Sequence, residues 1–187
     1  MPIKIFIDQG HNPVNPNAGS EGNGYREQDI TYRIGVDLAA LLNANPQFSA
    51  RLSRQNSTEV LGTTNTTSLS ARTNAANAWG ADYFISLHTN AAASSQATGT
   101  EAFVYSTVTP AYELAQEIVK KINEDAGLVN RGVFVRPGLY VLKRTAMPAV
   151  LVEMGFITNA RDARLMATQP QLFANAIYQG ILEYFGL

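Results

Sequence analysis

Near its start the chain reads Ile3-Lys4-Ile5-Phe6-Ile7-Asp8-Gln9-Gly10-His11, an apolar strand-like run that ends in a polar turn and a histidine. The pattern recurs twice: the apolar run 83–87 leads into His88, and the run 149–152 leads into Glu153. The chain of 187 residues has only these two histidines. In open sheets with parallel strands, ligands collect beyond the carboxyl ends of the strands, where loops aim side chains into a crevice. Two imidazoles and a carboxylate at such ends indicate a metal site.

Strand-like and helix-like patterns alternate along the whole chain. This alternation predicts an α/β domain with a twisted, mostly parallel or mixed sheet of about six strands and helices on both faces. Strands are predicted at residues 3–8, 50–54, 82–88, 99–106, 133–143 and 149–154. Helices are predicted at residues 26–43, 69–79, 111–126, 159–167 and 171–185. No repeat or linker interrupts the pattern, so we expect residues 1–187 to form a single domain.

The composition narrows the classes of protein to consider. A chain with 45% hydrophobic and 16% charged residues suits one domain with a sizeable core. The net charge is −1, the sequence pI is near 6.1 and the basic residues are scattered, so we do not expect nucleic acid as a partner. Because the chain has no cysteine, disulfides and thiolate nucleophiles are excluded, and any metal must be bound by His, Asp or Glu.

No apolar stretch approaches the ~18 residues that a membrane helix needs, so we do not expect membrane insertion. The first predicted strand begins at Ile3 and leaves no room for a signal peptide before it. We therefore expect a chain that carries no leader of its own.

The first predicted helix contributes a further carboxylate to the predicted site. Its apolar positions include Ile30, Ile34 and Leu38, and counting back three residues from Ile30 places Glu27 on the same inward face. An inward carboxylate needs a partner, because burying an unpaired charge is costly, and a cation beside it would meet that need. The alternative is a first-turn Glu that the helix dipole favours by ~0.3–1 kcal/mol, which would suit any face of the helix.

Together, His11, Glu27 and His88 form a set of two neutral imidazoles and one carboxylate. This is a known ligand set for a catalytic zinc ion, with a fourth position left to water. The three residues do not follow the helical His-Glu-x-x-His pattern, so the site would be assembled from separate elements. A single histidine near a sheet end is more often a hydrogen-bonded structural residue, but two of them at strand ends favour the metal.

Glu153 closes the apolar run 149–152, which we expect to be a central strand buried on both faces. Burial raises the pKa of a carboxyl group, and a nearby dication opposes that rise, so Glu153 is suited to accept and return a proton. The alternative is a structural ion pair between Glu153 and an arginine such as Arg131 or Arg144.

At this point the sequence resembles a known family, the zinc-dependent N-acetylmuramoyl-L-alanine amidases of type 3. The four ordered motifs that carry the resemblance are Asp8-Gln9-Gly10-His11, Glu27 at the start of a helix, Ser86-Leu87-His88-Thr89-Asn90 and Pro148-Ala149-Val150-Leu151-Val152-Glu153-Met154-Gly155-Phe156. Supporting pieces are Ser68-Leu69-Ser70-Ala71-Arg72, Gly99-Thr100-Glu101 and Thr158-Asn159 followed by Asp162. The chain departs from the family at Gln9, where proline is usual, which affects the turn before His11 and leaves the ligand in place.

The resemblance implies an amidase catalytic domain that hydrolyses the amide between N-acetylmuramic acid and the L-alanine of the peptidoglycan stem peptide. It implies one catalytic zinc ion bound by His11, Glu27 and His88, with Glu153 as the catalytic carboxylate. Zinc would polarise the scissile carbonyl, while Glu153 would take a proton from water and return it to the leaving amine. Further candidates for orienting the histidines or contacting the substrate are Asp8, Asn90, Glu101 and Arg131.

Two rival functions use the same features. Another zinc hydrolase, such as a carboxypeptidase or a sugar deacetylase, could use the same ligands on a different amide. A non-catalytic wall-binding module could keep a metal for folding alone, but structural zinc sites are closed by four protein ligands and need no spare carboxylate such as Glu153.

The expected partner is peptidoglycan or its muropeptides. We expect an open site without an obligatory activator, because the polar segment 89–98 is too short for an inhibitory helix such as some family members carry there. No separate wall-binding domain is expected within residues 1–187. A chain without a leader would reach the cell wall as a phage endolysin, as an enzyme released by lysis, or as the excised domain of an exported protein.

Overall fold

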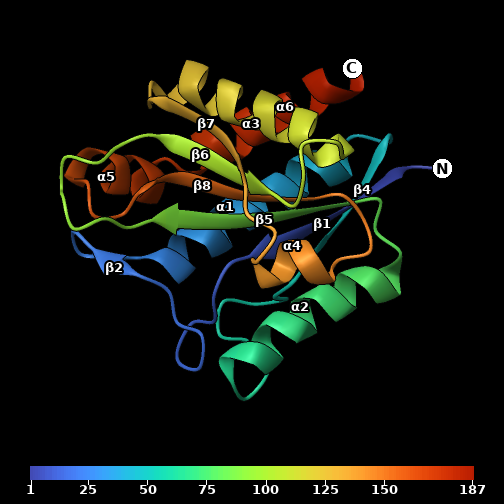
Figure 1. Ribbon diagram of the computed structural model, residues 1–187, viewed down its shortest axis with the longest axis horizontal. Helices are drawn as coiled ribbons and strands as arrows, with labels where there is room; N and C mark the ends of the chain where they lie inside the picture. The colour runs from blue at the N-terminus through green and yellow to red at the C-terminus, as the bar shows by residue number, and fades with distance from the viewer.

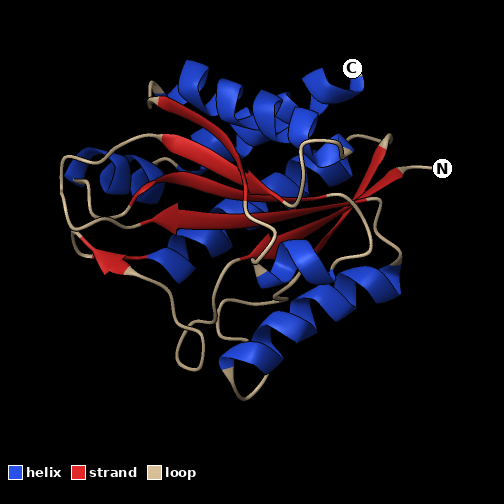
Figure 2. Ribbon diagram, in the orientation of Figure 1, coloured by secondary structure: helices blue, strands red, loops and turns tan.

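The computed structural model describes all residues from 1 to 187 and shows one six-stranded sheet between two layers of helices (Figures 1 and 2). The strands are β1 (Ile3–Gln9), β4 (Phe48–Leu52), β5 (Tyr83–Asn90), β6 (Thr100–Val104), β7 (Asn130–Val135) and β8 (Ala149–Phe156). Their order is β4-β1-β5-β8-β6-β7, and every neighbouring pair is parallel except β6 and β8. The predicted α/β fold with a mixed, mostly parallel sheet is confirmed.

The helices cover the two faces of the sheet unequally. The helices are α1 (Glu27–Ala44), α2 (Asn65–Trp79), α3 (Pro110–Ala126), α4 (Tyr140–Arg144), α5 (Ala160–Thr168) and α6 (Pro170–Phe185). The larger core, of 31 buried residues, joins one face of the sheet to α1, α3, α5 and α6. A second core of eight residues joins the other face to α2 and α4, which lie together on the opposite side in Figure 1. None of these helices is long and apolar enough to cross a membrane.

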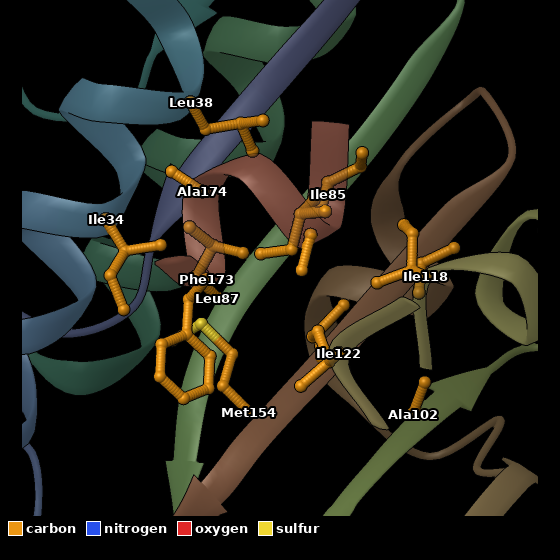
Figure 3. Close-up of a cluster of buried hydrophobic side chains, with 14 of the residues drawn as sticks. Ile34, Leu38, Ile85, Leu87, Ala102, Ile118, Ile122, Met154, Phe173 and Ala174 are labelled. Atoms are coloured by element: carbon orange, nitrogen blue, oxygen red, sulfur yellow. The ribbon is translucent and has the colours of Figure 1, made fainter. Parts of the chain in front are cut away.

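Strand alternation assigns each side chain to one of these cores. In β5, Ile85 and Leu87 belong to the larger core, which Figure 3 shows in close-up with Phe173 of α6. Phe84 of the same strand belongs to the smaller core on the α2 side. Because successive side chains point to opposite faces of a strand, His88 lies on the same face as Phe84. The sequence of β5 therefore directs its histidine away from the larger core.

The largest error in the prediction concerns residues 133–143. The strand predicted at 133–143 ends at Val135, and a helix, α4, occupies residues 140–144. Pro137 and Gly138 interrupt the run, since proline lacks a backbone donor for a sheet ladder. In α4, Val141 and Leu142 are buried in the smaller core, so packing against β8 and α2 favours a helical turn.

Other elements differ from the prediction by smaller amounts. The helix expected at 69–79 begins at Asn65, because Thr64 caps it: its hydroxyl accepts from the Thr67 backbone amide, and the Thr67 side chain accepts from the Thr64 amide. The strand expected at 50–54 lies at 48–52, and a two-stranded ribbon, β2 (Glu21–Gly22) and β3 (Tyr25–Arg26), was not predicted.

Candidate metal centre and catalytic carboxylate

Three side chains from separate elements converge at the carboxyl end of the sheet. His11 follows β1, Glu27 begins α1 and His88 lies near the end of β5. The Oε1 atom of Glu27 lies 3.2 Å from Nε2 of His11 and 3.1 Å from Nδ1 of His88. One potential ligand atom from each residue lies within 4.8 Å of the other two. The structure thus brings together the three residues that the sequence analysis selected as metal ligands.

Glycines allow this close approach. A Cβ atom at Gly10 would lie 2.5 Å from Cε1 of His88 and from the carbonyl oxygen of Leu87, a separation that real Cβ atoms do not adopt. A Cβ atom at Gly19 would lie 2.9 Å from atoms of both Glu27 and His11. The loop after β1 can therefore pass the imidazoles only because these two positions lack side chains.

Glu27 is the buried member of the cluster, with 3% of its side chain exposed. Its Oε2 atom accepts from the Ser20 amide and its Oε1 atom from the Thr89 amide, each at 2.9 Å. Burial on its own raises the pKa of Glu27, but the hydrogen bonds and charges of the two imidazoles outweigh it and hold the pKa well below its usual range. The carboxylate is therefore fixed in the ionised form that a metal ion requires.

The two histidines leave one side of the cluster open. Their side chains are 20% and 18% exposed, and their rings meet edge to face with centroids 4.8 Å apart. Two imidazole nitrogens and one ionised carboxylate make a set that suits zinc and leaves a position for water or substrate. The donor types, their spacing and the partial exposure of the two imidazoles all fit one zinc ion.

Glu153 lies beside this cluster on the neighbouring strand. In the sheet register it pairs with His88 of β5 on one side and with Glu101 of β6 on the other. Its Oε2 atom is buried and has no hydrogen-bond partner. Burial, followed by the negative charges of Glu27 and Glu101, raises the pKa of Glu153 to about 8. A carboxyl group in this environment can exchange a proton near neutral pH.

The structural ion pair considered for Glu153 is absent. Arg131 instead pairs with Glu101: the Nε atom of Arg131 donates to Oε2 of Glu101 at 2.7 Å. The Arg131 guanidinium also lies 5.1 Å from the ring centroid of Phe156. Arg144 forms no ion pair with Glu153 either. Glu153 is therefore free of a fixed cation within the chain.

The side chains of Asn90 and Asp8 form hydrogen bonds with groups other than the imidazole rings. Asn90 donates to Oε1 of Glu101 at 2.8 Å, which links it to the Glu101–Arg131 pair. Asp8 is fully buried and accepts from Arg72 and Ser86, each at 2.7 Å. Burial alone raises the pKa of Asp8, but the charge and hydrogen bond of Arg72 outweigh it and keep the pKa below its usual value.

Arg72 is the residue of this region to which sequence reasoning gave no role. Arg72 lies in α2, which is distant from β1 in the sequence, and it is 1% exposed. The only signal in the sequence was the segment 68–72, which supported the family resemblance without indicating a contact with the loop that carries His11.

An α/β fold that brings three potential metal ligands together, with a free carboxylate on the next strand, is compatible with a hydrolase. The family model described as N-acetylmuramoyl-L-alanine amidase matches residues 5–183, so the chain belongs to this family. The enzyme class inferred from the motifs is confirmed.

Individual relatives agree with the family. The chain is 36% identical over 189 residues to the sporulation-specific N-acetylmuramoyl-L-alanine amidase of Bacillus subtilis (strain 168), a match that covers 99% of this chain and 69% of that protein. The structure of this chain resembles the N-acetylmuramoyl-L-alanine amidase from Clostridium difficile 630, with a TM-score of 0.87 and 29% identity over 99% of this chain and 97% of that one. It also resembles the CwlD amidase of Clostridioides difficile, solved in complex with the GerS lipoprotein, with a TM-score of 0.89 and 26% identity over 98% of both chains.

Proposed function

We propose that this chain uses one zinc ion, held by His11, Glu27 and His88, to hydrolyse the amide between N-acetylmuramic acid and L-alanine in peptidoglycan. The observation that carries the proposal is the cluster of these three side chains next to Glu153, whose Oε2 atom is buried and without a partner. A structural zinc site would be closed by a fourth protein ligand and would not need this carboxylate. The action of the enzyme is placed at the cell wall, where its substrate lies.

The three ligands contribute differently to binding the ion. Glu27 supplies the negative charge from a buried position that two backbone amides fix. The two imidazoles supply neutral nitrogens from the partly exposed side of the cluster. A zinc ion bound there supplies a Lewis acid for the scissile carbonyl and increases the acidity of the attacking water.

Glu153 then acts as the base and, later, as the acid. Its carboxylate removes the proton from the attacking water and delivers a proton to the nitrogen of the leaving L-alanine. In the metal-free chain the raised pKa of about 8 favours the protonated form. A dication beside the carboxylate lowers that pKa, so the metal-loaded enzyme has an ionised base at neutral pH.

Asn90, Glu101 and Arg131 form the rim next to Glu153. Asn90 and Arg131 occupy both oxygens of the Glu101 carboxylate, which fixes its negative charge close to the base. The Arg131 side chain remains 40% exposed. We assign it a contact with the peptide part of the substrate, whose carboxylates suit a guanidinium held in place by Glu101 and the Phe156 ring.

No obligatory activator is required in this proposal. The three ligand side chains already converge in the chain alone, and residues 91–99, between β5 and β6, form no helix that could plug the site. The related CwlD amidase was solved with the GerS lipoprotein, so a requirement for a partner is the contrary outcome of the test.

The test is an assay of the purified, zinc-loaded chain on isolated peptidoglycan and on defined muropeptides, without any added protein. We expect new amino groups on L-alanine, identified by labelling and mass spectrometry, and no release of them by Glu153→Gln. Release of D-alanine or of free amines on the sugar would show a carboxypeptidase or a deacetylase instead. Activity that arises only after a partner is added would refute the open site.

A further inference from the structure

The buried arginine of α2 has no part in the mechanism above, and its burial needs an explanation. Arg72 is 1% exposed, and the sheet-facing residues of α2 around it, Ser68 and Ala76, are small. A charged side chain of this size is rarely buried unless its surroundings satisfy it. The partners of its guanidinium therefore indicate what it does.

These partners lie almost entirely in one short segment, residues 8–12. The Nη1 atom donates to Oδ1 of Asp8 at 2.7 Å and to the carbonyl oxygen of Gln9 at 2.6 Å. The Nη2 atom donates to the carbonyl oxygen of His11 at 2.7 Å and to Oδ1 of Asn12 at 3.1 Å. The remaining contact, at 3.3 Å, is to the hydroxyl of Ser53. One guanidinium thus binds the end of β1 and the turn that carries His11.

The turn needs such support because of its backbone conformation. The φ angle of His11 is 71°, in the left-handed region that residues with a Cβ atom adopt only when the surroundings hold them there. Hydrogen bonds of the sheet do not hold His11 in this conformation, since the last such bond of this segment runs from the Gly10 amide to the carbonyl oxygen of Leu87. In this conformation the His11 ring reaches Glu27, with its Nε2 atom 3.2 Å from Oε1.

A second residue on the same face of α2 supports the same loop. Ser68, one helical turn before Arg72, accepts from the side-chain amide of Asn17 at 3.0 Å. The backbone carbonyl of Asn17 in turn accepts from the Asn12 amide at 2.8 Å. Ser68 and Arg72 of α2 therefore both hold the loop after β1, Ser68 through Asn17 and Arg72 through residues 8–12.

We infer that Arg72 is a positioning residue of the metal centre: it holds the backbone of residues 8–12 so that His11 points toward Glu27 and His88. This inference rests on the proposed function of His11 as a zinc ligand. The guanidinium of Arg72 hydrogen-bonds to none of the ligand atoms, and the side chain is buried. Its loss should therefore weaken metal binding through the conformation of the His11 turn.

The test measures zinc affinity directly, by competition with a chromophoric chelator at pH 7, for the parent, Arg72→Lys and Arg72→Met. We expect Arg72→Met to raise the zinc Kd by about tenfold or more, which corresponds to about 1.4 kcal/mol. Arg72→Lys, which keeps the charge and some of the donors, should fall between the two. The cobalt-loaded variants should also show altered visible absorption, because the ligand geometry at His11 has changed.

Asn77→Ala is the matched control for a loss of stability alone. Asn77 lies on the same helix, and its side chain hydrogen-bonds to the Arg144 carbonyl and the Ala146 amide, in the loop before β8 at the opposite end of the sheet from the ligands. This variant should unfold more easily, yet keep its zinc Kd within about twofold of the parent, because distant sites act independently.

The outcomes separate the inference from the function on which it rests. A folded Arg72→Met that binds zinc as tightly as the parent would overturn the positioning role. If that variant does not fold, Arg72→Lys decides in the same way: a parent-like Kd and cobalt spectrum would overturn the role, and a several-fold weaker Kd would support it. A parent chain that binds no zinc would instead refute the proposed function.

Discussion

Replacing Glu153 by glutamine should stabilise the metal-free protein at neutral pH while it abolishes hydrolysis. Glutamine has nearly the shape of a protonated glutamate but carries no ionisable group. The environment of Glu153 opposes ionisation, first by burial and then by the charges of Glu27 and Glu101, and raises its pKa from 4.5 to about 8. The native state therefore gains from any change that removes the ionised form.

The sign and size follow from proton linkage. The folded protein holds the Glu153 proton more tightly than the unfolded chain, so the stabilisation is complete below about pH 4.5 and is lost as the pH rises through about 8. At pH 7 the resistance of Glu153 to ionisation lowers the free energy of unfolding of the parent by at most about 3 kcal/mol. Because Glu153 retains partial exposure, water screens part of the effect, and we expect a gain of about 1–3 kcal/mol for Glu153→Gln.

The assay is urea unfolding of both metal-free proteins between pH 4.5 and 8, with the free energies extrapolated to zero denaturant. The difference should be small at the acid end and grow steadily with pH, since other titrating groups such as Asp8 are common to both proteins and cancel. Glu101→Gln is the control: Glu101 is paired with Arg131, so at about pH 6, where Glu153 is still protonated and is not repelled by Glu101, its neutralisation should lower stability. A gain that does not change with pH would refute the reasoning, because it would not arise from ionisation.

Three further predictions concern the metal and the substrate. Dialysis against a chelator should abolish hydrolysis and added zinc should restore it; full activity in a preparation shown to be metal-free by elemental analysis would contradict the zinc mechanism. Glu153→Ala should keep about one zinc per chain and lose most of its turnover, whereas His88→Ala and Glu27→Ala should also lose metal, as measured by elemental analysis beside activity. Arg131→Gln should raise the KM for muropeptides by about tenfold with little change in kcat, and an unchanged KM would exclude the assigned substrate contact.

The sequence was informative where local patterns determine position. Apolar runs that end in His88 and Glu153 place both residues at the carboxyl ends of strands, and the parallel arrangement brings such ends to one edge of the sheet. The helical period from Ile30 back to Glu27 placed a carboxylate on the buried face, where the structure has it. These inferences needed only the periods of strand and helix.

Contacts between distant segments were beyond such reasoning. Arg72 lies 61 residues from His11, and its role depends on how α2 packs against the end of β1, which no periodicity reports. The pairing of Arg131 with Glu101 could not be predicted either, because it depends on the antiparallel placement of β6 beside β8, which puts Glu101 between that arginine and Glu153. The helix at 140–144 was missed because a stretch of five residues is too short to show a helical period.

The two faces of the sheet carry different kinds of groups. The larger core supplies most of the apolar burial, whereas the α2 side carries the groups that stability alone would not select: a left-handed His11, a partnerless Glu153 oxygen and a buried Arg72. Strained or unsatisfied groups persist only where the surrounding structure holds them, and they gather where chemistry requires them. The hydrogen bonds of Arg72 hold the strained turn, but no bond relieves Oε2 of Glu153. That contrast follows from function, because a ligand must stay fixed, whereas a base must remain free to take a proton.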